Sequence, residues 1–353
     1  MTLRQPNDAR VPRAALANVR PYVADDPPAP IHLADNTNLF GAPPTALRIV
    51  AAAGADALAQ YPTSSGPELR EAIASYLGIQ PNEIVIGGGG DDVIDCAFRA
   101  FCDPGDRLAF PDPTFVMARY FAITNNLIPC PIPVHADGAA DIEVLLDAGA
   151  SLTYICAPNN PTGLQPPASD LRAVLERAKG TVMIDEAYAE FAGETLAREV
   201  VQHGSAIIVR TFSKAFGLAG LRVGYAVGAP SLMQELEKAR GPFAVSTIAM
   251  RAATAAITDD LAWVRARVVD AIAAREELVR ALRGHGFAPL PSAGNFLLVP
   301  VADARRTAQR LAERGIGVRP FSQLTTIGDA IRITVAPRDV IQRVAAALAE
   351  SVR

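Results

Sequence analysis

The sequence predicts an α/β protein built on a mostly parallel β-sheet with helices on both faces. Short apolar runs alternate with helical patterns through most of the chain, and this alternation is typical of sheets whose parallel strands are joined by crossover helices. Glycine-rich or polar segments directly follow several of these runs, at the carboxyl edge where such sheets bind ligands. After residue 241 the pattern changes to an alanine-rich helix and a long amphipathic helix, which indicates a second, smaller α/β domain.

Composition shifts divide the chain into three predicted parts. The first 30 residues are rich in Pro, Arg and Asp and lack periodicity. Together with the turn-rich segment that follows, they form a predicted N-terminal arm over residues 1–44. A large domain is predicted over residues 45–240 and a small C-terminal domain over residues 241–353.

Periodicity and breaker residues locate the elements within these parts. A helical pattern covers residues 45–58, and Pro67 opens a second helix that runs to residue 77. Apolar runs of strand length lie at residues 83–86, 107–110, 127–132, 151–156, 181–184, 205–210 and 223–227, with helices over 93–101 and from residues 114 and 169. In the small domain, helices are predicted over residues 247–257, 260–282, 302–314 and 337–352, and strands near residues 295–299, 317–319 and 330–335. Gly284 is the expected C-cap of the long helix.

Composition also excludes several classes of function. A net charge of −4 on 353 residues provides no basic field for a polyanion, so we expect no nucleic-acid partner. No uncharged apolar run is long enough to span a bilayer and no signal peptide is evident, which favours the cytoplasm and no membrane contact. The four cysteines and four histidines show no paired spacing, so we expect free thiols in a reducing compartment and no metal site.

A glycine-rich segment at residues 87–92 lies between a predicted strand and a predicted helix. Bare backbone N–H groups and the helix dipole converge at such a junction, which makes it a candidate anion site. The segment fails the dinucleotide-binding fingerprint, because Asp92 stands where the third glycine would be, and no Gly-Lys-Ser/Thr follows to make a P-loop. A nucleotide-binding protein is therefore disfavoured.

The stretch from Thr211 to Tyr225 contains Lys214 shortly after a buried apolar strand. An amine forms a Schiff base with an aldehyde only while it is neutral, and desolvation or nearby cations lower its pKa. Ser213 and Arg222 add a hydroxyl and a fixed cation, which suit a phosphate monoester. A solvated lysine on a surface loop is the alternative, but the surrounding residues resemble the lysine loop of fold-type I pyridoxal phosphate (PLP) enzymes.

Other strand ends carry groups that suit PLP. Asp185 ends an apolar strand, where a buried carboxylate needs a partner, and a protonated pyridine nitrogen would be one. A helix cap or an ion pair is the alternative role of this residue. Asn160 and Tyr188 could hydrogen-bond the phenolic oxygen of the cofactor, although turn formation also explains the asparagine. Phe115 could stack on the cofactor ring or pack in the core.

These motifs resemble the histidinol-phosphate aminotransferases and their relatives among the class I and II aminotransferases, from residue 21 to the last helix. The resemblance implies fold type I, with a mostly parallel seven-stranded sheet covered by helices, a small α/β domain and an N-terminal arm. It also implies that Lys214 forms the Schiff base with PLP and shuttles the substrate proton. Asp185 would pair with the pyridine nitrogen, and Asn160 and Tyr188 would contact the phenolic oxygen. The residues implied for the cofactor phosphate are Thr211, Ser213, Arg222 and the amides of Gly90 and Asp91.

The resemblance further implies a partner subunit and residues for the substrate. Tyr61 would reach the phosphate bound in the neighbouring subunit, so the active site would be shared within a homodimer. Arg332 would grip the acidic group of the substrate, and Arg319 would help to hold a phosphate, with a salt bridge or a solvated charge as its alternative role. Tyr22 would cover the substrate from the arm. Asn36 would contact the substrate or brace its own turn.

The implied reaction is transamination in two steps, from histidinol phosphate to 2-oxoglutarate, giving imidazole-acetol phosphate and glutamate. Transfer from phenylalanine or another aromatic amino acid is the alternative within the family, and decarboxylation of a phosphorylated amino acid is a third hypothesis. The segment at residues 36–40, Asn-Thr-Asn-Leu-Phe, replaces the commoner Asn-Glu-Asn-Pro-Tyr and leaves the amino donor open. A PLP-binding regulator would need a fused DNA-binding domain or the loss of Lys214, and we find neither in this sequence.

Overall fold

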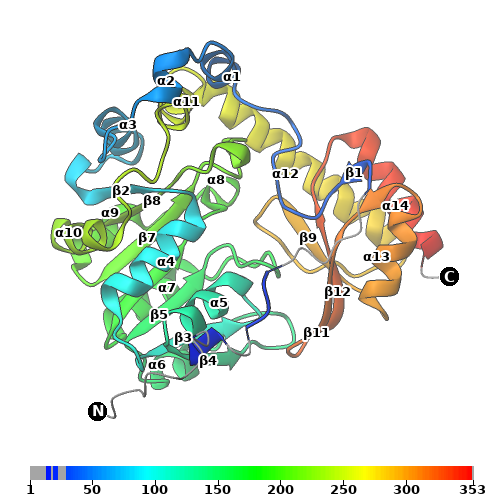
Figure 1. The fold of residues 1–353 in the computed structure, drawn as a ribbon. Coiled ribbons are helices and arrows are strands. Elements are labelled where there is room, and N and C mark those ends of the chain that lie inside the picture. Colours follow the sequence, from blue (N-terminus) through cyan, green and yellow to red (C-terminus); the bar gives the residue numbers. More distant parts are fainter. Residues whose placement is uncertain (1–12, 17–18, 23–28, 352–353) are drawn as a thin grey trace, which may run out of the picture.

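The computed structural model describes residues 13–16, 19–22 and 29–351, and its largest feature is a seven-stranded sheet (Figure 1). The strands lie in the order β2 (Ile84–Gly87), β8 (Gly224–Gly228), β7 (Ala206–Thr211), β6 (Thr181–Asp185), β5 (Leu152–Cys156), β3 (Arg107–Asp112) and β4 (Ile128–Pro133). β8 is antiparallel to both of its neighbours, and the other pairs are parallel. The predicted α/β class and mostly parallel sheet are confirmed.

Helices cover both faces of this sheet. Successive strand residues point to opposite faces, so each strand contributes to two cores. In β6, Val182 and Ile184 pack into one core, and Met183 packs into the other. The first core joins the sheet to α3 (Pro67–Leu77), α7 (Ala168–Arg177), α9 (Ala197–His203) and α11 (Thr247–Thr258). The second core joins it to α4 (Gly90–Phe101), α5 (Val116–Thr124) and α10 (Pro230–Ala239).

Short helices complete the large unit and correct one expectation. These elements are η1 (Ala14–Leu16), α1 (Pro44–Ala51), α2 (Ala55–Ala59), η2 (Pro81–Glu83), α6 (Ile142–Asp147), α8 (Ala189–Ala192) and η3 (Ala219–Leu221). The single helix predicted over residues 45–58 is wrong, because the extended Gly54 separates α1 from α2. The sequence pattern also gave no indication of α6, α8, α9 and α10. The first three have seven residues or fewer, too few to show a helical period.

A smaller α/β unit is built on a three-stranded antiparallel sheet, with order β11 (Arg319–Leu324), β12 (Gly328–Thr334) and β9 (Phe296–Pro300). The carboxyl half of α12 (Leu261–Gly284), α13 (Ala304–Ala312) and α14 (Arg338–Ser351) pack with it around a separate core. The expected C-cap at Gly284 is wrong. The N–H of Phe287 closes the helix on Leu282 O, which puts the left-handed position of the cap at Gly286.

The last part of the predicted arm, just before α1, connects the two units. β1 (Ile31–His32) pairs in parallel with β10 (Ile316–Gly317) of the small unit. Farther along, Asn38 Nδ2 donates to Ala215 O in the lysine loop at 2.9 Å. Although α11 and the start of α12 follow residue 241, they pack into the core of the large sheet, so the change of core falls within α12 (Figure 1). The domain boundaries at residues 44 and 240 stay predictions, and residues 1–12, 17–18 and 23–28 of the arm lie outside the described residues.

Candidate active site

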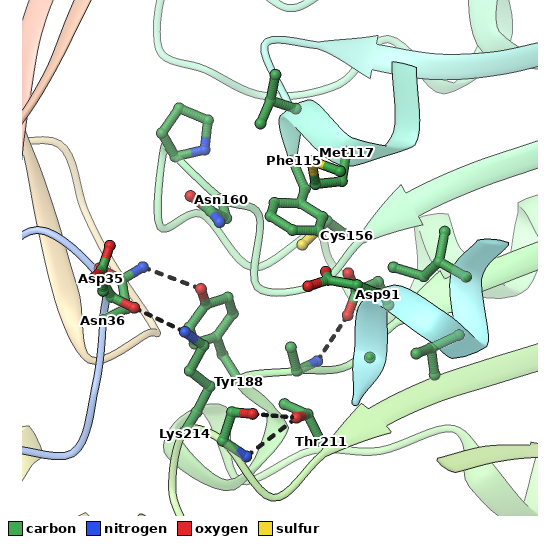
Figure 2. Close-up of a pocket in the computed structure, with 18 of the residues that line it drawn as sticks. Asp35, Asn36, Asp91, Phe115, Met117, Cys156, Asn160, Tyr188, Thr211 and Lys214 are labelled. Carbon is green, nitrogen blue, oxygen red and sulfur yellow. Dashed lines mark hydrogen bonds between the residues drawn. The ribbon is translucent and has the colours of Figure 1, made fainter. Parts of the chain in front are cut away.

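A cavity of about 570 Å³ lies between the carboxyl edge of the large sheet and the small unit (Figure 2). All but one of the predicted site residues line it, namely Tyr22, Asn36, Gly90, Asp91, Phe115, Asn160, Asp185, Tyr188, Thr211, Ser213, Lys214, Arg222, Arg319 and Arg332. The exception is Tyr61, which is 83% exposed and stacks on Phe243 with 4.9 Å between ring centroids. The fold therefore gathers residues from the arm, from five strand ends and from the β11–β12 hairpin.

Asp185 ends β6, level with Cys156 on β5 and Val209 on β7. Its carboxylate accepts hydrogen bonds from Tyr154 Oη at 2.7 Å and from the backbone N–H of Ala187 at 3.0 Å. Burial raises the pKa of Asp185 to about 6, and these two hydrogen bonds oppose that rise. A buried carboxylate held in this way suits a cationic N–H group that faces it from the cavity.

Lys214 follows β7, and its Nζ lies in the cavity. The ammonium group donates to Asp35 O at 2.8 Å and lies 5.8 Å from the centre of the Tyr188 ring. Desolvation by burial and the positive charge of Arg332 lower the pKa of Lys214 to about 8. A fraction of the amine is therefore neutral near neutral pH, as nucleophilic chemistry requires.

Tyr188 and Asn36 form a hydrogen-bonded pair beside Lys214 (Figure 2). Asn36 Nδ2 donates to Tyr188 Oη at 3.0 Å, and the backbone N–H of Asn36 donates to Thr334 Oγ1 at 2.9 Å. Asn36 adopts a left-handed backbone with φ 54°, which asparagine tolerates better than most residues. The amide thus braces the turn and orients a tyrosine. Its direct contact with a substrate stays a prediction.

A group of phosphate-type donors meets at the amino end of α4. Gly89 has φ 94°, and a Cβ on it would lie 2.7 Å from Arg222 Nη2, so glycine is required for the guanidinium to approach. Arg222 Nη1 donates to Ser213 Oγ at 3.4 Å, and Thr211 Oγ1 donates to the same oxygen at 3.0 Å. These hydroxyls, the guanidinium and the amides that begin α4 at Gly90 together suit a phosphate group.

Arg319 and Arg332 are cross-strand partners on β11 and β12, so their side chains leave the same face of the hairpin. Arg332 lies between the rings of Phe296 and Phe321, each centred 5.6 Å from its Cζ. It donates to Asn160 Oδ1, while its buried Nε has no hydrogen-bond partner in the described part of the chain. Like charges on opposed residues are destabilising, and both guanidiniums are nearly buried. The arrangement therefore suits an anionic group that enters from the cavity.

The remaining predicted residues lie at the margins of the cavity. Phe115 directly precedes α5 and contributes its ring to the wall (Figure 2). Tyr22, the arm residue, is 56% exposed at the open side. Arg319 forms the ion pair that was its alternative role, with Nη2 2.8 Å from Asp35 Oδ1.

Comparison with known proteins decides the family. The family model for aminotransferase class I and II matches residues 28–348, which include every cavity residue named above except Tyr22. The chain belongs to the class I and II aminotransferases. This family is PLP-dependent, so the predicted family, enzyme class and cofactor are confirmed.

Relatives of this aminotransferase cover most of its length. It is 38% identical to a histidinol-phosphate aminotransferase of Geobacillus thermodenitrificans, over 89% of this chain and 88% of the relative. It is 35% identical to one of Methanosarcina mazei, over 95% and 91% of the two chains. Among solved structures, the histidinol-phosphate aminotransferase of Sinorhizobium meliloti in complex with pyridoxal-5'-phosphate has a TM-score of 0.85 at 30% identity, with 92% of each chain covered.

The residues of the cavity fit PLP. The donors at the start of α4 and in the lysine loop could hold the phosphate, Asp185 could hold the pyridine N–H, and Lys214 offers an amine to the aldehyde. Bound PLP supplies an electron sink for negative charge on the substrate carbon. Within the described residues, no group of His, Cys, Asp and Glu side chains could hold a metal ion. No helix in that part of the chain is long and apolar enough to cross a membrane.

Sequence reasoning missed Tyr154, the residue that positions Asp185. Tyr154 is fully buried in β5 and does not line the cavity. A tyrosine within an apolar strand is typical of an ordinary core residue. The available signal was its hydroxyl, which needs a partner when buried, on the strand that neighbours the one ending in Asp185.

Replacement of Tyr154 by Phe is expected to weaken PLP binding about tenfold or more, because a hydrogen bond to a charged group contributes about 1.5–3 kcal/mol. The Tyr154 hydroxyl lowers the pKa of Asp185. Its removal should therefore raise that pKa, and binding should fail at a higher pH on acidification. Titration of the apo-protein with PLP across pH measures both effects. Tyr225→Phe, a buried tyrosine of the same sheet, is the control. If Tyr154→Phe lost PLP on acidification at the same pH as the wild type, the proposed effect of Tyr154 on Asp185 would be contradicted.

Proposed function

We propose that this aminotransferase converts histidinol phosphate and 2-oxoglutarate to imidazole-acetol phosphate and glutamate. The observation that carries the proposal is the pair of nearly buried arginines, Arg319 and Arg332, on opposed positions of the β11–β12 hairpin. Two planar cations match the double charge of a phosphate dianion, whereas one arginine is enough for a carboxylate. The relatives named histidinol-phosphate aminotransferase, at 34–38% identity, support the same substrate.

In the proposed mechanism, Lys214 moves the proton. Its Nζ is neutral for part of the time because its pKa is about 8. Nζ can therefore accept a proton from the substrate carbon and donate it again in a later step. Asp185 would hold the N–H of the pyridine ring, and its own orientation is held by Tyr154. Tyr188 and Asn160 would donate to the phenolic oxygen of the cofactor. Arg332 keeps Asn160 in place through Asn160 Oδ1, which leaves the amide N–H groups of Asn160 to donate into the cavity.

The remaining roles concern binding. Thr211, Ser213, Arg222 and the amides of Gly90 and Asp91 would hold the cofactor phosphate, Phe115 would stack on its ring, and Tyr22 and Asn36 would border the substrate. Tyr61 is proposed to act on the phosphate site of a partner subunit. Its exposed ring, stacked on the half-exposed Phe243 outside its own cavity, supports this homodimer. The four free cysteines support a reducing compartment, in which the cytoplasm is the proposed location.

The test is the absorbance spectrum of the holoenzyme mixed with L-histidinol phosphate or with L-phenylalanine in the absence of a keto acid. We expect rapid conversion to the pyridoxamine form with histidinol phosphate and slow conversion with phenylalanine. The opposite order would move the enzyme to aromatic amino acids. The departure at residues 36–40 is the specific feature that favours this second candidate, because Thr37 lines the cavity.

Within the same experiment, Arg319→Ala should weaken binding of the phosphorylated donor about tenfold to hundredfold, since a hydrogen bond to a charged group contributes about 1.5–3 kcal/mol. The loss of affinity for phenylalanine should be much smaller. The control is Arg172→Ala, an exposed arginine on α7 that pairs with Glu199 and does not line the cavity. Equal losses for both donors in Arg319→Ala would argue against a phosphate role for this arginine.

A further inference from the structure

Arg319, the proposed phosphate ligand, already has a carboxylate partner inside the cavity. Asp35 Oδ1 lies 2.8 Å from Arg319 Nη2, and Asp35 Oδ2 lies 2.9 Å from His32 Nε2. Asp35 lines the same cavity as both arginines and Lys214. An anion that binds Arg319 must therefore displace Asp35 or lie beside its negative charge.

The backbone holds Asp35 in this place. Asp35 O accepts from Lys214 Nζ at 2.8 Å (Figure 2), and both neighbours in the chain are buried. Ala34 O accepts from Arg332, and the N–H of Asn36 donates to Thr334 Oγ1. The backbone on either side of Asp35 is thus fixed to the small unit, and its carboxylate is presented to Arg319.

The Asp35 carboxylate itself can move away from Arg319. Its side chain is 47% exposed, compared with 10% for Arg319. A displaced carboxylate could be hydrated, and it could keep its contact with His32, whose side chain is 42% exposed. Asp35 is therefore better described as an exchangeable ligand of Arg319 than as its permanent partner in a structural ion pair.

Competition from this carboxylate depends on the charge of the incoming group. The Coulomb repulsion of a dianion by Asp35 is about twice that of a monoanion at the same distance. Solvent screening at a half-exposed side chain reduces both terms. Asp35 should therefore penalise a phosphate dianion more than a single carboxylate.

We propose that Asp35 is a specificity-determining residue, an internal carboxylate that competes for Arg319 and brings the affinities of a phosphate substrate and a carboxylate substrate closer together. The inference rests on the proposed function, in which one cavity takes a phosphorylated donor and a keto acid in turn. Without Asp35, the phosphorylated donor would bind more tightly and occupy the form of the enzyme that must receive the keto acid.

The test uses two probes of nearly equal shape, methylphosphonate and methanesulfonate, at a pH above the second pKa of methylphosphonate, so that the first is a dianion and the second a monoanion. Dissociation constants are measured for the holoenzyme from the cofactor absorbance or from competition with 2-oxoglutarate. Asp35→Asn should tighten methylphosphonate binding about tenfold and methanesulfonate binding only about threefold, because repulsion scales with charge. In turnover, Asp35→Asn should also show inhibition by the phosphorylated donor at a lower concentration than the wild type.

The matched control is Asp270→Asn on α12, which removes an equally exposed carboxylate paired with Arg267 away from the cavity. It should change neither dissociation constant. Asp35→Ser provides a second neutral variant, and thermal unfolding with the cofactor spectrum checks that each variant folds.

Equal tightening of both probes, no change, or weaker binding of both in the Asp35 variants would overturn the inference. Weaker binding of both would make Asp35 a positioning residue for Arg319. Failure of the proposed function has a different signature. In that case histidinol phosphate would be a poor donor for the wild type, while the change in the ratio of the two probe constants could still appear in Asp35→Asn.

Discussion

Lys214→Ala is expected to abolish measurable transamination, with a loss of up to about 10⁴-fold, because the residue proposed to move the proton is removed. The visible absorption band of the lysine-bound cofactor should disappear as well. The rate at which the wild-type apo-protein captures PLP should rise with pH to a plateau above about 8, since the lowered pKa of Lys214 sets the neutral fraction of the amine. Stopped-flow absorbance measures this rate.

The control for this variant is Lys238→Ala. Lys238 is an exposed lysine on α10 that pairs with Glu235 and does not line the cavity. It should leave the cofactor band and turnover unchanged. Retained transamination in Lys214→Ala would refute the central assignment, whereas loss of activity in both variants would indicate a general effect of removing a lysine.

Asp185→Asn should reduce turnover about 10³-fold, because a neutral amide no longer stabilises a positive pyridine nitrogen electrostatically. The substitution keeps the shape of the side chain, and its oxygen could still accept from Tyr154 or from the N–H of Ala187. We therefore expect a folded protein that binds PLP more weakly. The kcat of single half-reactions and the dissociation constant of PLP measure the two effects.

Asp112→Asn is the matched comparison for Asp185→Asn. Asp112 also ends a parallel strand of the large sheet, but its carboxylate accepts from Thr325 at 2.6 Å and does not line the cavity. A small effect in Asp112→Asn and a large one in Asp185→Asn would assign the loss to the cofactor contact. Similar losses in both would indicate that strand-end carboxylates act only on stability.

The sequence alone determined the main sheet and most of the cavity. Largely apolar runs of strand length, several of them followed by a helical pattern, predict a sheet buried on both faces, since residues of either parity must pack. Functional residues at the carboxyl ends of parallel strands meet at one edge whatever the strand order. Lys214, Asp185 and Asn160 could for this reason be assigned to one site before any coordinates were known.

Strand direction and the break between α1 and α2 needed the structure. The sequence pattern of β8 does not differ between parallel and antiparallel pairing, so its reversed direction follows only from contacts with β2 and β7. The residues over 45–58 have helical periodicity throughout, and only the structure shows that the extended Gly54 interrupts the helix. Local propensity is too weak to predict either feature.

Tertiary structure alone decided how the charges of the site are paired. Arg319 and Arg332 become neighbours through the register of the β11–β12 hairpin, which includes an irregularity near residues 321–324 that periodicity does not reveal. Asp35 meets Arg319 from 284 positions away in the chain, and Tyr154 meets Asp185 across two strands. A hydrogen bond or an ion pair depends on distances of a few ångströms between side chains, and a sequence carries the identity of both partners but not that distance.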